Sequence, residues 1–284
     1  MLELLQRCHG NYLLCEDKLE IPLQDFADCR HKYSGSVFLL ASGPSAGAFP
    51  VSCYANYPFI AMNGSIARFV DEKIKPLFYI CSDPSFPAAR PDLAIMGCEH
   101  ASHIAMALEC FEEIYSHDKS VLMGKSLYLL ERVNRYYNKQ SVSDRRFAWS
   151  IRNNAELISN FSLLRKRPNR IGFSKNMHHG YFCARTIVYI ALQLVYTLGF
   201  RKVFITGMDL SGNIGRFYED KGKGLPTSLD DEFDKIICPS FQLVAKKIIC
   251  DDFSVFNLSA SSRLPDSMIP KITLKQLDCL LAQK

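Results

Sequence analysis

VFLLASGPS, residues 37–45, joins an apolar run to a turn of small and polar residues. An uninterrupted apolar run of this length is typical of a strand that is buried on both faces of a parallel sheet. The turn that follows contains glycine, proline and serine, residues that are common where a strand ends. The segment therefore predicts a parallel α/β sheet in which residue 42 opens the ligand-binding edge.

The same combination of apolar run and polar turn recurs along the chain. Further strands are predicted at 58–62, 76–81, 202–206 and 254–258, with a shorter one at 120–123. Apolar residues at three- and four-residue steps predict a helix at 181–198 that ends at Gly199. A second helix is predicted at 232–249, although Pro239 must interrupt it. This alternation predicts a doubly wound, Rossmann-like, mostly parallel α/β sheet with helices on both faces.

The stretch 98–176 differs from the segments on either side of it. It is polar and rich in Arg and Tyr, and no strand is expected in it after Val121. We expect it to form a helical lid and acceptor region over the carboxyl edge of the sheet. The whole chain, 1–284, is expected to be a single domain whose nucleotide-binding core comprises 37–97 and 177–262.

Composition limits the class of protein. The chain has 284 residues, of which 48% are hydrophobic, enough for a large core. It has no run of about 18 apolar residues, and its N-terminus lacks the pattern of a signal peptide, so a cytoplasmic location is expected. Eleven cysteines without CxxC or zinc-finger spacing are expected to be reduced thiols.

The net charge is +5, and basic residues cluster at Arg145-Arg146 and at 165–170. A solvated loop is the simplest interpretation of these clusters. An anionic substrate or an anionic membrane surface would explain them equally well. Nucleic acid is not expected as a partner, because no recognition motif accompanies the charge.

Ligands of open parallel sheets bind beyond the carboxyl ends of the strands, where the strand order reverses. Four predicted strand ends carry small or polar residues, and each alone is also compatible with an ordinary turn. Together they predict a site for a nucleotide or a nucleotide-activated substrate. Gly43 would let backbone N–H groups approach a phosphate, although the loop has neither the Walker A nor the GxGxxG pattern. The substrate-binding candidates are Ser42, Gly43, Pro44, Ser45, Asn63, Gly64, Ser65, Ser85, His178, Gly180, Tyr181, Gly207, Asp209, Leu210, Arg216 and Tyr218.

The polar side chains among these candidates suit particular parts of a nucleotide. Asn63 offers a donor and an acceptor to a ribose hydroxyl or a base edge. Asp209 could orient a ribose or the loop itself. Arg216 and Tyr218 could contact an anionic leaving group.

Asp83 and a histidine pair are the candidates for acid–base chemistry. Pro84 favours an extended conformation at Asp83, which could direct the carboxylate into the cleft, and an ordinary Asx turn is the alternative. His178 and His179 precede the long helix, where they could hold a phosphate or a carboxylate, or act as a general base. A solvated pair is the alternative. Adjacent histidines seldom bind one metal ion together, so no metal is expected.

The order of these motifs resembles that of the single-domain bacterial sialyltransferases. More specific segments are similar to the lipopolysaccharide-core transferases that add a third residue of the keto sugar acid Kdo. These segments are 99–102, 172–175, 180–181, 207–212, 216–218 and 225–228, and they extend over nearly the whole chain. The resemblance implies CMP-Kdo as the donor and a Kdo residue on lipid A as the acceptor. It also implies metal-independent transfer without a further cofactor, at the inner leaflet of the cytoplasmic membrane.

Two positions depart from the sialyltransferase pattern. The sialyltransferases carry Asn where this chain has Ser42, and their catalytic histidine follows the G-x-D strand end, whereas this chain has no histidine beyond His179. Asp83 takes the place of an asparagine that lies close to the donor sugar in those enzymes. We therefore expect Asp83 to be catalytic, as general base if the linkage inverts or as nucleophile if it is retained, with His179 as the second candidate.

Three alternatives stay open at the level of the sequence. The chain could transfer another CMP-activated nonulosonic acid. It could be a nucleotide-dependent diphosphokinase, since related strand-end patterns occur in a pterin pyrophosphokinase family, and it would then need ATP and a divalent metal. It could also be a nucleotide-binding module that has lost catalysis. Stabilisation by CMP, and not by ATP, would favour transfer of a CMP-activated sugar.

Overall fold

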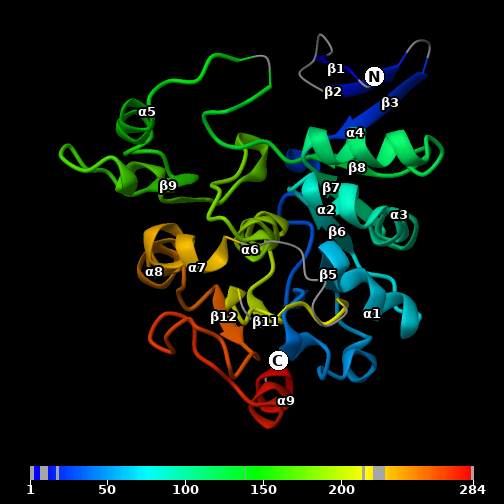
Figure 1. Cartoon of the computed structure of the whole chain (residues 1–284). Helices are drawn as coiled ribbons and strands as arrows, with labels where there is room; N and C mark the ends of the chain where they lie inside the picture. Colours follow the sequence, from blue (N-terminus) through cyan, green and yellow to red (C-terminus); the bar gives the residue numbers. More distant parts are fainter. Residues whose placement is uncertain are drawn as a thin grey trace.

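The segment that opens the predicted site forms β4, which lies inside a ten-stranded sheet (Figure 1). The computed structural model describes residues 3–6, 12–16, 19–137, 139–212, 215–219 and 228–282. The strand order is β1-β2-β3-β8-β7-β6-β5-β4-β11-β12. Neighbouring strands from β3 to β12 in this order are parallel, whereas β1 and β2 add an antiparallel edge. The strands of this sheet are β1 (Glu3–Gln6), β2 (Tyr12–Glu16), β3 (Leu19–Gln24), β4 (Ser36–Leu40), β5 (Phe59–Met62), β6 (Phe78–Cys81), β7 (His103–Met106), β8 (Leu127–Leu129), β11 (Lys202–Thr206) and β12 (Ser254–Asn257).

The order of the strands reverses beside β4. The chain builds the sheet outward from β4 through β5, β6 and β7 to β8, and later returns to place β11 on the other side of β4. Consecutive connections therefore leave β4 and β11 in opposite directions, which opens a crevice beyond their carboxyl ends. The turn at 42–45 lies at this crevice.

Helices cover both faces of the sheet, as the sequence predicts (Figure 1). Alternate strand residues enter two separate apolar cores, because successive side chains of a strand point to opposite faces. Val37 and Leu39 join the core under α6 (Ile187–Leu198) and α8 (Cys238–Lys247). Phe38 and Leu40 join the other core, which is covered by α1 (Ile66–Asp71), α3 (Pro91–His100), α4 (Leu108–His117) and α9 (Leu274–Ala282).

The strand predictions are confirmed at five of the six positions. The exception is 120–123, which forms a turn, and the chain enters β8 only at Leu127 after Gly124, whose φ of +67° suits glycine. β7 and β8 also correct the expectation for 98–176, because the first third of that stretch completes the sheet. These two strands escaped the sequence analysis because the stretch that contains them is polar and rich in Arg and Tyr as a whole. The edge strands β1 to β3 were missed as well.

The rest of the stretch projects beyond the sheet (Figure 1). It contains α5 (Asp144–Ser150) and an antiparallel pair, β9 (Leu157–Ser159) and β10 (Gly172–Ser174). No helix among the described ranges is long and apolar enough to cross a bilayer.

Both predicted helices are present with altered bounds. α6 begins at Ile187, later than expected, and ends at Gly199, whose left-handed φ of +100° confirms its role as the terminating glycine. The predicted helix at 232–249 consists of α7 (Leu229–Glu232), a π-helical turn (Phe233–Ile237) and α8. The irregular turn lies immediately before Pro239, at the start of α8, where the missing N–H of proline removes no helical hydrogen bond.

Candidate active site

The loops that follow β4, β5, β6 and β11 meet at the strand-order reversal and line a cavity of about 400 Å³, called here the reaction pocket. The first turn of α6 closes the opposite wall. Of the residues singled out in the sequence, the reaction pocket is lined by Ser42, Gly43, Pro44, Asn63, Asp83, Gly207, Asp209, Leu210 and Arg216. The structure therefore brings together residues from four strand ends that are up to 174 positions apart in the chain.

Asp209 is a buried tether within this pocket and not a free ligand for a ribose. Asp209 is only 2% exposed. One carboxylate oxygen accepts hydrogen bonds from the backbone N–H and the hydroxyl of Ser45, at 3.1 and 2.9 Å. The other accepts from the hydroxyl of Ser261 at 2.6 Å. Of its two predicted roles, the structure shows the second, since Asp209 holds the 42–45 turn against the loop after β11.

Positions 43 and 64 require glycine, because neighbouring side chains occupy the space that a Cβ would need. A Cβ on Gly43 would lie 2.2 Å from a carboxylate oxygen of Asp209. A Cβ on Gly64 would lie 2.2 Å from the ring of Tyr218. Packing therefore accounts for both glycines without a phosphate. The ring of Tyr218 is packed over Gly64 and does not line the reaction pocket, and burial raises its pKa to about 12.

Asn63 has the features of a ligand-binding residue. Its backbone adopts a left-handed conformation with φ +49°, at the end of β5. Its side-chain oxygen is buried and has no hydrogen-bond partner in the part of the chain that the structure describes. A buried polar atom without a partner costs free energy, which a ligand group at this position would recover. The adjacent Ser65 is different, because its hydroxyl accepts the N–H of Met62 and completes the turn.

Asp83 is exposed and lines the reaction pocket at the end of β6. One of its carboxylate oxygens accepts hydrogen bonds from the N–H and the hydroxyl of Ser85, at 3.1 and 2.8 Å. This is the Asx turn considered as the alternative in the sequence analysis. It fixes the orientation of the carboxylate, whose second oxygen accepts no hydrogen bond from the described residues. Ser85 is occupied by this turn and does not line the pocket.

Three arginines line the reaction pocket, and the sequence analysis had singled out only one of them. Arg132 follows β8, and its Nε donates to the hydroxyl of Tyr181 at 3.5 Å. Arg185 is exposed, has φ +59° and directly precedes the N-terminal turn of α6. Arg216 forms an ion pair with Glu219. The predicted substrate ligand Tyr181 is buried and contacts Arg132 instead of lining the pocket.

A signal for Arg185 was present in the sequence. A cation at a helix N-terminus opposes the helix dipole, so it is unfavourable there unless an anion binds beside it. Arg132 carried no such signal, because the strand before it was not recognised. The arginines and the start of α6 give the reaction pocket a positive potential suited to an anionic ligand.

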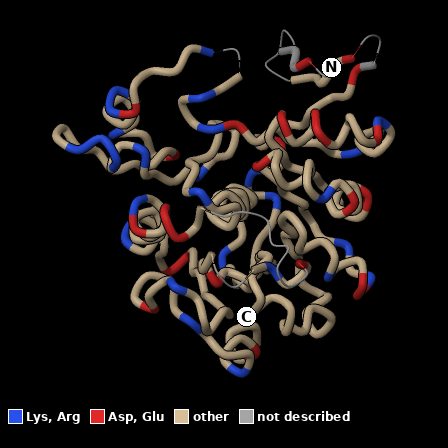
Figure 2. Tube along the Cα trace, in the orientation of Figure 1, with Lys and Arg blue, Asp and Glu red and all other residues tan. Residues whose placement is uncertain are grey.

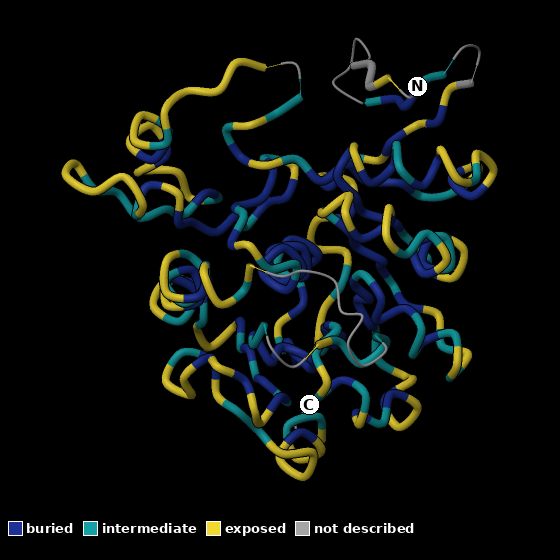
Figure 3. Tube along the Cα trace, viewed as in Figure 1, coloured by how far each residue is buried: buried dark blue, intermediate teal, exposed yellow. Residues whose placement is uncertain are grey.

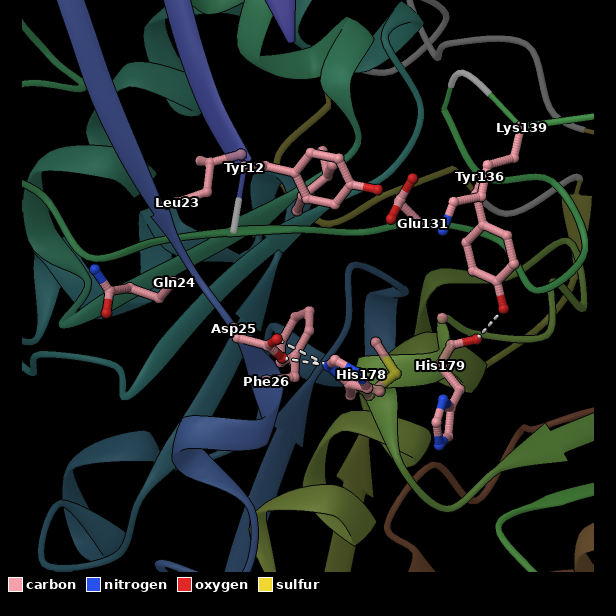
Figure 4. A pocket seen from close by; sticks show the side chains of 13 residues that line it. Tyr12, Leu23, Gln24, Asp25, Phe26, Glu131, Tyr136, Lys139, His178 and His179 are labelled. Atoms are coloured by element: carbon pink, nitrogen blue, oxygen red, sulfur yellow. Dashed lines mark hydrogen bonds and ion pairs between the residues drawn. The ribbon is translucent and has the colours of Figure 1, made fainter. Parts of the chain in front are cut away.

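The histidine pair lies in a second cavity of about 380 Å³, beyond the carboxyl ends of β3 and β8 (Figure 4). His178 Nδ1 lies 2.8 Å from the carboxylate oxygens of Asp25, and His179 Nε2 lies 2.8 Å from Glu156. Gly180 lines the same cavity, and its φ of +79° and the nearby carbonyl of Glu131 exclude a side chain there. The structure therefore separates the two catalytic candidates, because Asp83 and His179 line different cavities.

Within the described ranges, no group of three or more His, Cys, Asp or Glu side chains is arranged to hold a metal ion. Of the motif at 225–228, residues 225–227 lie outside the described residues.

Comparison with known proteins gives one family and two curated relatives. The family model described as 3-deoxy-D-manno-octulosonic acid transferase WaaZ matches residues 24–275. The chain is 25% identical over 250 residues to a probable 3-deoxy-manno-octulosonic acid transferase of Escherichia coli K12, covering 87% of this chain and 86% of that one. It is 26% identical over 242 residues to the protein of the same description in Salmonella typhimurium LT2, covering 84% and 87%.

Two solved structures that match the chain with low identity have the following descriptions. The MAf glycosyltransferase of Magnetospirillum magneticum AMB-1 matches 92% of this chain and 38% of its own longer chain, with 15% identity and a TM-score of 0.45. The sialyltransferase CstII of Campylobacter jejuni in complex with CMP-3FNeuAc matches 82% of this chain and 84% of its own, with 13% identity and a TM-score of 0.40.

Proposed function

Since the chain belongs to the WaaZ family of 3-deoxy-D-manno-octulosonic acid (Kdo) transferases, we propose that it transfers Kdo from CMP-Kdo to a Kdo residue of the lipopolysaccharide inner core. The observation that carries this proposal is the cationic reaction pocket at the strand-order reversal. The family match favours glycosyl transfer over the diphosphokinase alternative.

The charges of the reaction pocket suit the proposed donor. CMP-Kdo carries a negative phosphodiester and a negative carboxylate, so a bound donor needs cations or N–H groups near both. Arg132, which follows β8, and Arg185 with the adjacent N-terminus of α6 supply them. Asn63 would accept a hydrogen bond from a hydroxyl or an amino group of the nucleoside.

In the proposed reaction, the anomeric carbon of the donor loses its bond to a phosphate oxygen and forms a bond to the hydroxyl oxygen of the acceptor. The bond from this carbon to the phosphate oxygen breaks, and CMP leaves with the electron pair. The arginines stabilise the charge that develops on the leaving phosphate, a role that a metal ion serves in other transferases. If transfer inverts the configuration at the anomeric carbon, we assign to Asp83 the removal of the proton from the acceptor hydroxyl. If the configuration is retained, we assign to Asp83 the nucleophilic attack on the anomeric carbon.

The acceptor places the proposed reaction at a membrane. A Kdo residue of the inner core is attached to lipid A, and the donor is made in the cytoplasm. We therefore propose that the protein works at the cytoplasmic face of the inner membrane.

The proposal is tested by incubating the protein with CMP-Kdo and lipid A that already bears Kdo. The expected result is release of CMP and a product that is heavier by one Kdo residue, with the new linkage determined by NMR. Transfer should continue in EDTA, since no metal is assigned to the reaction. Turnover of another CMP-activated nonulosonic acid, with none of CMP-Kdo, would contradict the donor assignment.

A further inference from the structure

The part of the chain between α5 and β10 carries the excess charge of the whole protein. Residues 144–170 include seven Lys and Arg against two Asp and Glu, an excess of five. This excess equals the net charge of +5 of the entire chain, so the remaining residues are balanced. Figure 2 shows these basic residues gathered on the projection that contains α5 and β9.

Six of these cations form no ion pair within the described part of the chain. Both acidic residues of the segment are already engaged, Asp144 with Arg135 and Arg170, and Glu156 with Arg30 and His179. The six exposed side chains are Arg145, Arg146, Arg152, Arg165, Lys166 and Arg167. They are therefore available to anionic groups outside the protein.

Large apolar side chains are exposed among the same cations. Six such side chains are exposed in the described ranges, and four of them are Val142, Trp149, Leu163 and Leu164. Leu163 and Leu164 are 68% and 93% exposed, and Trp149 is 51% exposed. Figure 3 shows that much of the projection with α5 and β9 is exposed. The Trp149 ring lies 5.1 Å from that of Phe161, so α5 and the leucine loop form one surface.

The leucine loop is held in shape by a buried asparagine. Asn169 is only 2% exposed, and its amide accepts the N–H of Ser162 and donates to the carbonyls of Ser162 and Arg165, at 2.9 to 3.0 Å. The two leucines lie between these anchored residues. Their exposure therefore belongs to an ordered loop, which presents them outward next to three consecutive basic residues.

Neighbouring cavities lie between this surface and the reaction pocket. The cavity beside the leucine loop and the next one share Arg135 and Arg170 as lining residues. That second cavity shares Arg132 and Arg185 with the reaction pocket. Arginines therefore line all three cavities, so cations extend from the surface to the pocket.

We propose that Trp149, Leu163, Leu164 and the six cations without an ion pair form a docking surface for an anionic lipid bilayer. Leucine and tryptophan enter the boundary between headgroups and acyl chains, while arginine and lysine bind the anionic headgroups. Docking in this way brings the arginine-lined cavities close to the membrane. The proposal does not rest on the transfer reaction, because bilayer binding can be measured without donor or acceptor. Nucleic acid would use the same cations but gains little from exposed leucines.

The single tryptophan of the chain is part of this surface and reports on it directly. Vesicles of phosphatidylglycerol and phosphatidylcholine should bind the full-length protein, shift the emission of Trp149 to shorter wavelength and expose it to quenching by brominated acyl chains. Vesicles of phosphatidylcholine alone should neither bind the protein nor change the emission of Trp149. An unshifted emission with the anionic vesicles would overturn the proposal.

Matched variants separate the two parts of the surface. Arg165→Gln/Lys166→Gln/Arg167→Gln should lower the vesicle partition coefficient about 100-fold, and Leu163→Ser/Leu164→Ser about tenfold at unchanged charge. Leu274→Ser and Lys32→Gln/Lys75→Gln/Lys275→Gln alter exposed residues elsewhere and should leave it unchanged.

Two outcomes of this series would overturn the proposal. If the serine pair binds vesicles like the wild type, or if RNA competes fully with vesicles, the surface is a general anion or nucleic-acid site. If the controls lose as much binding as the test variants, the surface is not the docking site. Transfer to a water-soluble Kdo acceptor should be unaffected by every variant, which distinguishes failure of docking from failure of the proposed reaction.

Discussion

Asp83 and Asn63 lie at the ends of adjacent strands, and the structure prepares them differently for a ligand. Among the described residues, one oxygen of Asp83 accepts hydrogen bonds within its own turn and the other accepts none, whereas the buried side-chain oxygen of Asn63 has no partner. The first arrangement orients a reactive group, and the second reserves a hydrogen bond for a ligand. Both residues were identified from the sequence, because each follows an apolar run.

Asp83→Asn tests the catalytic assignment. Asparagine can accept the same two hydrogen bonds from Ser85, so the turn is expected to persist while the base or nucleophile is lost. We expect the rate of transfer to fall at least about 100-fold, with CMP-Kdo bound as by the wild type. Steady-state kinetics and calorimetry measure the two quantities. Asp92→Asn is the control, since Asp92 pairs with Arg90 outside the pocket. A rate near that of the wild type would refute the assignment.

Arg185→Gln tests the donor site. Loss of a charged hydrogen-bond donor to the phosphate or the carboxylate should weaken CMP-Kdo binding by about tenfold or more. The dissociation constant measured by calorimetry checks this. Arg201→Gln is the matched control, because Arg201 is an exposed arginine at the opposite, amino end of β11. Equal losses in both variants would point to general electrostatics and not to a donor contact.

At the scale of elements, α6 is the helix on which the reaction pocket depends. Its N-terminal turn lines the pocket, and its other end packs against the loop before β4 through Gly199. A Cβ on Gly199 would lie 2.6 Å from the carbonyl oxygen of Tyr33. The position therefore requires glycine for its left-handed backbone and for the close approach.

Gly199→Ala should consequently destabilise the fold more than a substitution that causes backbone strain alone. Gly124→Ala is the control, because Gly124 also has a positive φ but has open space around it. We expect a loss of about 1 kcal/mol in the free energy of unfolding for Gly124→Ala. For Gly199→Ala the loss should be larger by about 1 kcal/mol or more. Urea unfolding measures both, and equal losses would show that the close approach is unimportant.

Glu156, the residue directly before β9, contacts side chains from distant parts of the chain. Hydrogen bonds from Asn176 and His179 and the nearby Arg30 lower the pKa of its carboxyl below the ordinary value. A lowered pKa stabilises the folded state above the unfolded value of about 4.3, and this stabilisation is lost as the pH falls through the folded value. Glu156→Gln should therefore be less stable than the wild type at neutral pH.

The difference between Glu156→Gln and the wild type should shrink below about pH 4. Thermal unfolding followed across this pH range checks the prediction. Glu99→Gln removes an exposed carboxylate that has no ion pair among the described residues, and it serves as the control. A difference that does not depend on pH would exclude the carboxylate as its cause.

At the scale of the whole molecule, ligand binding at the strand-order reversal should stabilise the fold. The reaction pocket joins loops from both halves of the sheet, so a ligand held there binds the folded state alone. CMP at about 100 times its dissociation constant should add about 2.7 kcal/mol to the free energy of unfolding and raise the melting temperature. ATP with Mg²⁺ should add little, and a larger effect of ATP would support the diphosphokinase alternative.

The sequence predicted those elements that local patterns can specify. Long apolar runs identified β4, β5, β6, β11 and β12, and the three- and four-residue period identified α6. The strands β7 and β8 went undetected, because they lie in a stretch that is polar and rich in Arg and Tyr as a whole. The bounds of the projecting region were wrong for the same reason.

The sequence by itself determined that polar turns follow buried parallel strands, and hence that Asn63 and Asp83 lie at a common edge of the sheet. Tertiary structure alone decided where the strand order reverses, and it is this reversal that opens the crevice. It also brought Arg132 and Arg185 to the reaction pocket and moved His179 to another cavity. The physical reason is that a strand follows from residues close together in the chain, whereas a pocket depends on which distant segments the crossovers place side by side.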